Sequence, residues 1–390
     1  MTADEGARTI SAMGRSPRWL LALLVLAGCS LQADRPAPPV HMREGLSPLL
    51  RIDRKYGSME GPEAAGEFVL QPGPRELLWV TAYRTQIVDA EGKADPALSE
   101  FMCHNNLDFD ARSHASLFGL ERPLNFGRVF TASQGVFEIR FPEGFAIPVL
   151  SDEPFTVMTQ ALNHNRENPD FAVRHRIEVE YVRDADAAGA FEPLYPVAAM
   201  VMALVQGRDG YYGLDDAPEH ALQGATCAPG MVAPNAPEGT RHYTDTKGRV
   251  FTPHWVVPPG REVRHTLVTD VLNVPFETRL HYIGAHMHPF AESLALRDLT
   301  TGETLFTAHT RAPAEGIGLA QVDHYSSPEG LPLHPDHEYE LVSVYDNPTD
   351  SDKDAMAVFF LYFHDHEAAQ KLDAVRAELA AAATELAGGL

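Results

Sequence analysis

The sequence predicts an all-β protein of two domains that ends in a single helix. Short runs rich in Val, Ile, Phe and Tyr recur along the chain, separated by Gly, Pro, Asn and Asp. This pattern is typical of antiparallel strands in a sandwich or barrel. The chain of 390 residues is too long for one typical hydrophobic core, so two domains are expected.

The first predicted domain covers residues 67–205. Its clearest strand is 175–182, where Ile177, Val179 and Tyr181 alternate with charged residues, so that one face is apolar and the other polar. Further runs at 77–83, 136–141 and 155–162 have the same β-rich composition.

The second predicted domain covers residues 250–365. Its strands are expected at 262–268, 278–283, 292–297, 338–345 and 355–363. Residues 206–249 are rich in Gly and Pro and predict a long interdomain loop, a kind of segment that is often functional.

The C-terminal segment 366–390 has a different pattern. Leu372, Val375, Leu379 and Leu386 recur at helical spacing among Ala, Glu, Lys and Arg. The segment therefore predicts an amphipathic helix, which either docks on a domain or pairs with a second copy of the chain.

The N-terminus predicts export. Basic Arg15 and Arg18 precede a short apolar run, and small residues follow it, as in a secretory signal over residues 1–29. Its end, Leu-Ala-Gly-Cys at 26–29, resembles the lipobox of bacterial lipoproteins. The resemblance implies that Cys29 is lipidated and anchors the protein to a bacterial membrane, facing the periplasm or the exterior. Residues 30–66 would then form a tether and lead-in.

Charge and cysteine content narrow the function further. The formal net charge is −23, from 54 acidic and 31 basic residues, which argues against nucleic acid as a partner. Two cysteines remain beyond the predicted signal, Cys103 and Cys227. They are candidates for a disulfide in an oxidising compartment, or for a buried thiol and a loop thiol.

A His-x-His triplet is the strongest candidate site. His286 and His288 flank Met287, and a strand through them would place both imidazoles on one face. With the thioether of Met356 they would form a soft site that suits copper. The alternatives are two surface histidines at the end of a strand and a methionine of the core.

Two segments carry a family resemblance. Ala-His-Met-His at 285–288 and Ser-Asp-Lys-Asp-Ala-Met-Ala-Val-Phe-Phe at 351–360 resemble the C-terminal half of the copper type II, ascorbate-dependent monooxygenases. The resemblance implies two packed antiparallel, jelly-roll-like β-sandwiches. It also implies a copper held by His286, His288 and Met356, and O2-dependent C–H hydroxylation of a peptide or small molecule with a reductant such as ascorbate.

The same family has a second copper, and its counterpart here is incomplete. His104 stands where a pair of adjacent histidines would begin, but Asn105 follows it, and His164 is the candidate third ligand. His281, Tyr282 and His324 are candidates for residues that contact and orient the ligands of the main site.

Two other functions remain open at this point. The first is a copper-binding lipoprotein of the same fold without catalysis. The second is a cupin-like metal site, because His286, His288 and Glu292 fit a His-x-His-x₃-Glu pattern.

Overall fold

The structure is a computed structural model that describes residues 37–58, 60–122, 127–204, 243–244, 250–274 and 276–388, of which Pro38 onward belong to one compact unit. The signal segment with Cys29, most of the loop 206–249 and Cys227 lie outside the described residues. The signal, the lipid anchor and the disulfide therefore stay predictions.

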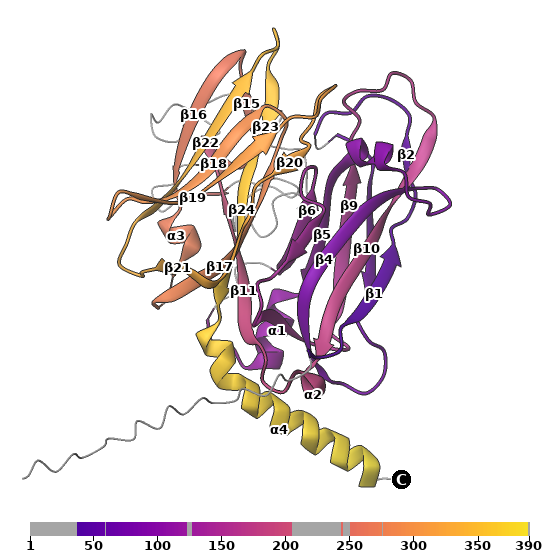
Figure 1. Ribbon diagram of the computed structural model, residues 1–390, viewed down its shortest axis with the longest axis vertical. Coiled ribbons are helices and arrows are strands. Elements are labelled where there is room, and N and C mark those ends of the chain that lie inside the picture. The colour runs from indigo at the N-terminus through magenta and orange to yellow at the C-terminus, as the bar shows by residue number, and fades with distance from the viewer. Residues whose placement is uncertain are drawn as a thin grey trace, which may run out of the picture. The chain divides into compact units, whose positions relative to one another are not determined.

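The predicted fold class is confirmed, because the described chain is mostly strand and its sheets are largely antiparallel. Figure 1 shows two β-rich halves, one coloured indigo to magenta and the other orange to yellow.

The first half contains two sheets, β1-β10-β4-β8 and β3-β9-β5-β6, with β2 and β7 added to the first. Tyr83 of β4 stacks on Phe130 of β6 with ring centroids 5.2 Å apart, so the sheets pack face to face. The strands are β1 (His41–Leu46), β2 (Leu50–Ile52), β3 (Glu63–Phe68), β4 (Leu77–Asp89), β5 (Met102–Phe109), β6 (Arg128–Ser133), β7 (Glu138–Arg140), β8 (Phe145–Leu150), β9 (Phe155–Ala161) and β10 (Phe171–Arg183). The helices are η1 (Pro96–Phe101), α1 (Ala111–Phe118) and α2 (Asp184–Ala187).

The second half packs β11-β24-β17-β21 against β16-β22-β18-β19-β20. Phe306 of β19 and Phe359 of β24 meet between these sheets, with ring centroids 5.9 Å apart. The larger strands are β11 (Glu192–Met200), β16 (Gly260–Leu267), β17 (Thr278–Met287), β18 (Ala291–Asp298), β19 (Glu303–Arg311), β21 (Tyr325–Leu333), β22 (Tyr339–Asn347) and β24 (Ala357–His364). The shorter elements are β12 (Ala203–Leu204), β13 (Tyr243–Thr244), β14 (Val250–Thr252), β15 (Trp255–Val257), α3 (Thr269–Leu272), β20 (Gln321–Val322) and β23 (Lys353–Ala355).

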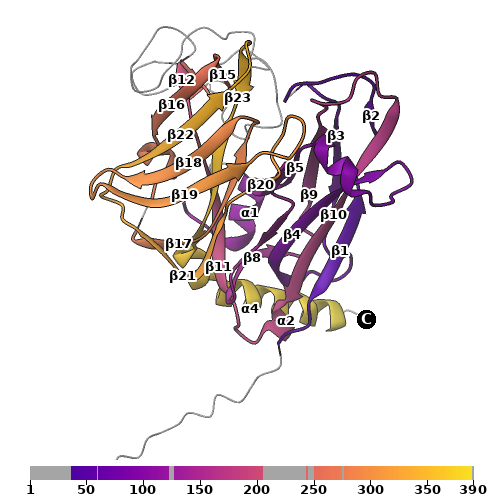
Figure 2. The ribbon, with the colours of Figure 1, turned by 45° about the horizontal axis from the view of Figure 1, so that its top comes forward.

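The two halves share one sheet. β24 pairs with β11 on one side and with β17 on the other, and β11 pairs with β8 in parallel. β11 belongs to the stretch of sequence predicted as the first domain, yet its longest pairing is with β24 of the second. The domain boundaries stay a prediction, and Figure 2 shows β11 beside β8 where the halves meet.

Some elements differ from the sequence interpretation. β1 and β2 lie inside residues 30–66, which were interpreted as a loosely structured lead-in. β1 carries little local strand signal because it is almost wholly exposed, and it is a strand because it pairs with β10. Tertiary pairing decides such edge strands more than local composition does.

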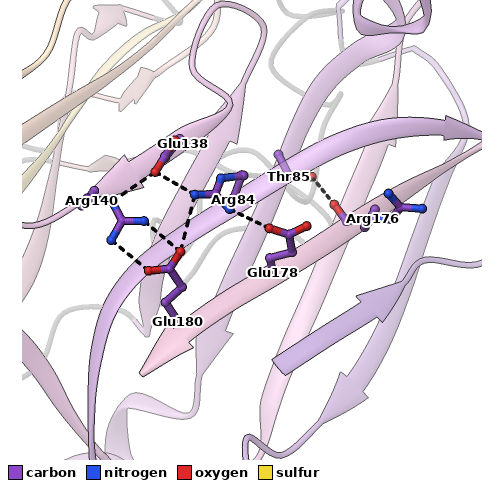
Figure 3. Close-up of polar contacts among 7 residues, drawn as sticks. All are labelled: Arg84, Thr85, Glu138, Arg140, Arg176, Glu178 and Glu180. Atoms are coloured by element: carbon purple, nitrogen blue, oxygen red, sulfur yellow. Dashed lines mark hydrogen bonds and ion pairs between the residues drawn. The ribbon is translucent and has the colours of Figure 1, made fainter. Parts of the chain in front are cut away.

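The alternation predicted for 175–182 is confirmed. Ile177, Val179 and Tyr181 of β10 are buried, while the opposite face carries an ion-pair network with β4 and β7 (Figure 3). In this network Arg84 contacts Glu178 at 2.8 Å and Glu138 at 3.1 Å. These side chains are partly exposed, so the network adds solubility more than stability.

The C-terminal helix is docked, which is one of the two predicted alternatives. α4 (His366–Gly388) buries Leu372 and Val375 against Trp79 and Phe118 of the first half. Its Arg376 reaches Asp184 through two contacts of 2.9 Å, and Asp184 also accepts from Trp79 Nε1 at 2.8 Å. Self-association through this helix stays a prediction. None of the helices in the described residues is long and apolar enough to span a membrane.

Replacing Asp184 by Asn is expected to lower the free energy of unfolding by about 1–2 kcal/mol at pH 7, since a partly buried charged pair is lost. Burial raises the pKa of Asp184, but the bonds to Arg376 and Trp79 outweigh it, and the pKa lies below 3.8. The Asp184 contribution is therefore complete at neutral pH and lost as the pH falls through the lowered pKa.

Urea denaturation of the wild type and Asp184→Asn at pH 7 and pH 3 measures this effect. Asp373→Asn is the matched control, because Asp373 pairs with the same Arg376 but is 93% exposed. Equal loss of stability in both variants would contradict the docking role of Asp184.

Candidate active site

The predicted histidine pair lies at the end of one strand, with His286 inside β17 and His288 directly after it. β17 runs through Met287, and the rings of His286 and His288 lie 5.3 Å apart between centroids. Both side chains are buried, with exposed fractions of 5% and 2%. The structure therefore differs from the alternative of two surface histidines.

Residues predicted for two separate metal sites lie in one place. His104, on β5, has its ring 6.2 Å from that of His286. His164 follows β9 and interacts electrostatically with His288 and Asp354. We call His104, His164, His254, His286 and His288 the imidazole cluster.

Sequence reasoning missed His254. It lies between β14 and β15, with its ring 6.3 Å from that of His288, and is 5% exposed. It follows directly on the Gly- and Pro-rich stretch and belongs to no spacing motif, so the sequence carried no signal for it.

The charge of the cluster is set by Asp354 of β23. Its Oδ2 lies 2.8 Å from His288 Nδ1, an ion-pair distance, although the two atoms are not aligned for a conventional hydrogen bond. Burial lowers the pKa of His288, but the charge of Asp354 outweighs burial and raises it above 6.5. Burial likewise raises the pKa of Asp354, and the charge of His288 brings it below 3.8. Each partner therefore favours the charged form of the other.

Two of the neighbouring imidazoles, those of His286 and His164, have lowered pKa values and are neutral. Burial, together with the charges of His288, His104 and His254, holds the pKa of His286 well below 6.5. Burial also lowers the pKa of His164, against the attraction of Asp354. Nε2 of His164 is buried and has no hydrogen-bond partner among the described residues. His164 is thus a base in its proton-accepting form.

Met356 lies between β23 and β24 and is completely buried in the hydrophobic core. Its carbonyl oxygen accepts hydrogen bonds from Tyr345 Oη at 2.6 Å and from the backbone N–H of His288 at 3.2 Å. The backbone of Met356 therefore lies beside the cluster.

The remaining predicted side chains have other contacts. His281 stacks on Phe145 with centroids 3.7 Å apart, and Tyr282 stacks on His324 at 5.6 Å. Cys103 is buried with its Sγ 3.6 Å from Gln160 Oε1.

A cavity of about 270 Å³ opens beside the cluster, where the two halves meet. His164, His254 and Asp354 line it together with the carboxylates of Glu60 and Asp352. An apolar side is formed by Pro289, Phe290 and Ile317. Ser58 also lines the cavity, and its buried Oγ has no hydrogen-bond partner among the described residues.

The turn after His288 is strained. Ala291 N–H donates to the carbonyl of His288 at 3.4 Å, so residues 288–291 form a tight turn. Phe290 occupies its third position with φ of 73°, where such turns favour Gly or Asn. A bulky residue in this region is uncommon and marks many functional sites.

Comparison with known proteins finds no matching family model and no matching curated protein. Among solved structures the chain is similar to PNGase F, a glycosylasparaginase from Flavobacterium meningosepticum, with a TM-score of 0.36 and 7% identity over 83% of this chain and 96% of that one. It is also similar to a peptide-N(4)-(N-acetyl-β-D-glucosaminyl) asparagine amidase, with a TM-score of 0.34, 7% identity and the same coverage. These scores are too low to support an argument about activity.

The predicted membership of the copper type II monooxygenases is wrong. The matching solved structures headed by PNGase F are not copper enzymes, and neither other comparison supports that family. Among the described residues, no three His, Cys, Asp or Glu side chains are placed to hold one metal ion. The His-x-His pattern is too general to identify a copper site, because the same spacing also occurs in a cluster of histidines that pairs with a carboxylate.

The alternatives are corrected with it. The hypothesis of a copper-binding lipoprotein depends on the same resemblance to the copper monooxygenases. The cupin-like site requires the carboxylate of Glu292 beside the histidines, but the carboxylate found there is that of Asp354. Glu292 is 46% exposed and pairs with Arg261 at 3.1 Å, while His288 pairs with Asp354. Metal ligation by individual members of the predicted set stays a prediction, and nothing below depends on it.

The strained turn predicts an inverted order of stability for two variants. Phe290→Gly is expected to be more stable than Phe290→Ala by about 1 kcal/mol, because both lose the ring but only Gly adopts a positive φ without strain. Chemical denaturation measures both.

The exposed strand position Thr304 of β19 is the control. There the Ala variant should be more stable than the Gly variant by about 0.5–1 kcal/mol. An Ala variant more stable than the Gly variant at position 290 would show that the turn is unstrained.

Proposed function

We propose that this protein is an enzyme that hydrolyses a small polar substrate by general acid–base catalysis in the cavity where its halves meet. One observation carries the proposal. Asp354, which pairs with the buried His288, lines a cavity that is also lined by the neutral imidazole of His164. Perturbed groups of this kind, gathered in one cavity, are typical of active sites.

The charge of the cavity favours a cationic substrate. Glu60, Asp352 and Asp354 contribute three carboxylates to its lining, against the single ammonium group of Lys353. The buried hydroxyl of Ser58 supplies a further polar group for the substrate. A protonated amine would be attracted by these carboxylates, of which Glu60 and Asp352 are exposed and Asp354 is partly buried.

The residues divide the chemistry between them. His164 is neutral and accepts a proton from a water molecule as its oxygen bonds to the substrate, and it returns that proton to the leaving group as the scissile bond breaks. Asp354 stabilises positive charge on the substrate, and His288 positions Asp354 by pairing with it. The fixed charges need no rearrangement during the reaction, which is the usual origin of electrostatic stabilisation in enzymes.

The location of the enzyme is part of the proposal. The basic and apolar leader and the Leu-Ala-Gly-Cys sequence at 26–29 support export and lipidation of Cys29. In a bacterial host, Cys29→Ser is expected to move the protein from the membrane to the soluble fraction, as fractionation and radiolabelled fatty acid would show. Membrane retention of this variant with unchanged label would contradict the anchor.

Hydrolysis can be tested with fluorogenic esters, amides and glycosides of 4-methylumbelliferone and 7-amino-4-methylcoumarin, in cationic, neutral and anionic forms. The wild type is expected to turn over at least one cationic member. His164→Gln and Asp354→Asn should each lower kcat by about 10²–10⁴, the usual range for loss of acid–base or charge assistance.

His309→Gln and Asp350→Asn are the matched controls, because both side chains are exposed and do not line the cavity. They should keep wild-type rates. Absence of turnover across the panel, or full activity in Asp354→Asn, would overturn the proposal.

A further inference from the structure

A short segment of the second half forms hydrogen bonds with two amide side chains of the first half. Asn165 Oδ1 accepts from the N–H of Ile317 at 2.8 Å, and its Nδ2 donates to the Ile317 carbonyl at 3.1 Å. Gln134 Oε1 accepts from the N–H of Leu319 at 2.8 Å. We call residues 316–319 the clamped segment.

The two amides are themselves held in place. Asn165 Nδ2 lies 3.2 Å from Glu100 Oε2, and Gln134 Nε2 donates to the Glu100 carbonyl at 3.1 Å. Each amide therefore has its donor and its acceptor occupied, which fixes its orientation. The clamp is rigid because η1, which ends next to Glu100, supports both side chains.

Glycine is required on both sides of Ile317. Gly316 has φ of 81°, and a Cβ there would lie 2.8 Å from Asn165 Oδ1. A Cβ on Gly318 would lie 2.9 Å from Gln134 Oε1. Any side chain at either position would push the clamped segment away from its amides.

The clamp positions Ile317 in the cavity wall. Ile317 and Phe290 line the same cavity as the carboxylates of Glu60, Asp352 and Asp354. One side of the cavity is thus apolar and the other acidic. The strained turn fixes Phe290, and the clamp fixes Ile317.

We infer that the clamped segment is the specificity element of this cavity, and that it selects amines that carry an apolar substituent. This inference rests on the proposed function, whose substrate class it refines. The ammonium group meets the carboxylates, and the substituent packs between Ile317 and Phe290. Ile317 is a specificity-determining residue, while Asn165 and Gln134 are positioning residues.

Isothermal titration of the full chain with the chlorides of methylammonium, n-butylammonium and benzylammonium tests the inference. The wild type is expected to bind the two larger cations at least tenfold more tightly than methylammonium, because apolar surface is buried. Ile317→Ala and Gly316→Ala should each reduce this ratio to about threefold or less. Gly316→Ala is the sharper variant, because it changes no side chain that lines the cavity.

Gly302→Ala is the matched control. Gly302 also has a positive φ, of 77°, but an added Cβ would meet no heavy atom within 4 Å. This variant should have a lower melting temperature because of backbone strain. Its ratio of affinities for the larger cations and methylammonium should equal that of the wild type.

The outcomes separate the two proposals. Equal affinity for all three cations in the wild type would overturn the inference and leave the acidic site intact. An unchanged ratio in both Ile317→Ala and Gly316→Ala would also overturn it. If none of the three cations binds, the proposed class of cationic substrates is overturned. The hydrolysis panel, which includes neutral and anionic substrates, tests the proposed function independently.

Discussion

The site depends on β24 lying between β11 and β17. Ala198 and Gly284 both pair with Phe360, so strands from distant parts of the chain are in one sheet. This pairing brings His286, near the end of β17, close to His104 of β5, and His288 follows directly after the strand. Without it the imidazoles of the two halves would not meet. The buried central strand also explains why residues 357–363 are uniformly apolar, since both faces of β24 are covered.

Burial then decides the chemistry of the cluster. Several imidazoles share a region of low dielectric, where a second positive charge is unfavourable. Asp354 compensates His288, while burial keeps His286 neutral. A fixed ion pair beside neutral bases is an arrangement suited to moving protons. The strained turn at Phe290 and the clamp on Ile317 give the same cavity an apolar wall, so shape and charge discriminate among ligands together.

Much of the architecture could be predicted from sequence, and the partners in the site could not. Alternation with period 2 predicted β10 and its buried face, and the His-x-His spacing predicted that His286 and His288 lie close together at the end of a strand. Spacing cannot reveal which residue approaches from another strand. Asp354 lay within the segment 351–360 without a role assigned to it, and His254 belonged to no motif. The family resemblance failed because its short motifs are compatible with more than one chemistry. The clamp of Asn165 on Ile317 joins residues 152 positions apart, a contact that only the fold specifies.

The central claim is that the cavity holds a cationic group against Asp354, and a crystal structure with benzylammonium tests it most directly. The account predicts the ammonium nitrogen within hydrogen-bond distance of the Asp354 carboxylate and the ring against Ile317 and Phe290. A ligand bound elsewhere, or one whose ammonium avoids Asp354 and whose ring avoids Ile317, would contradict it.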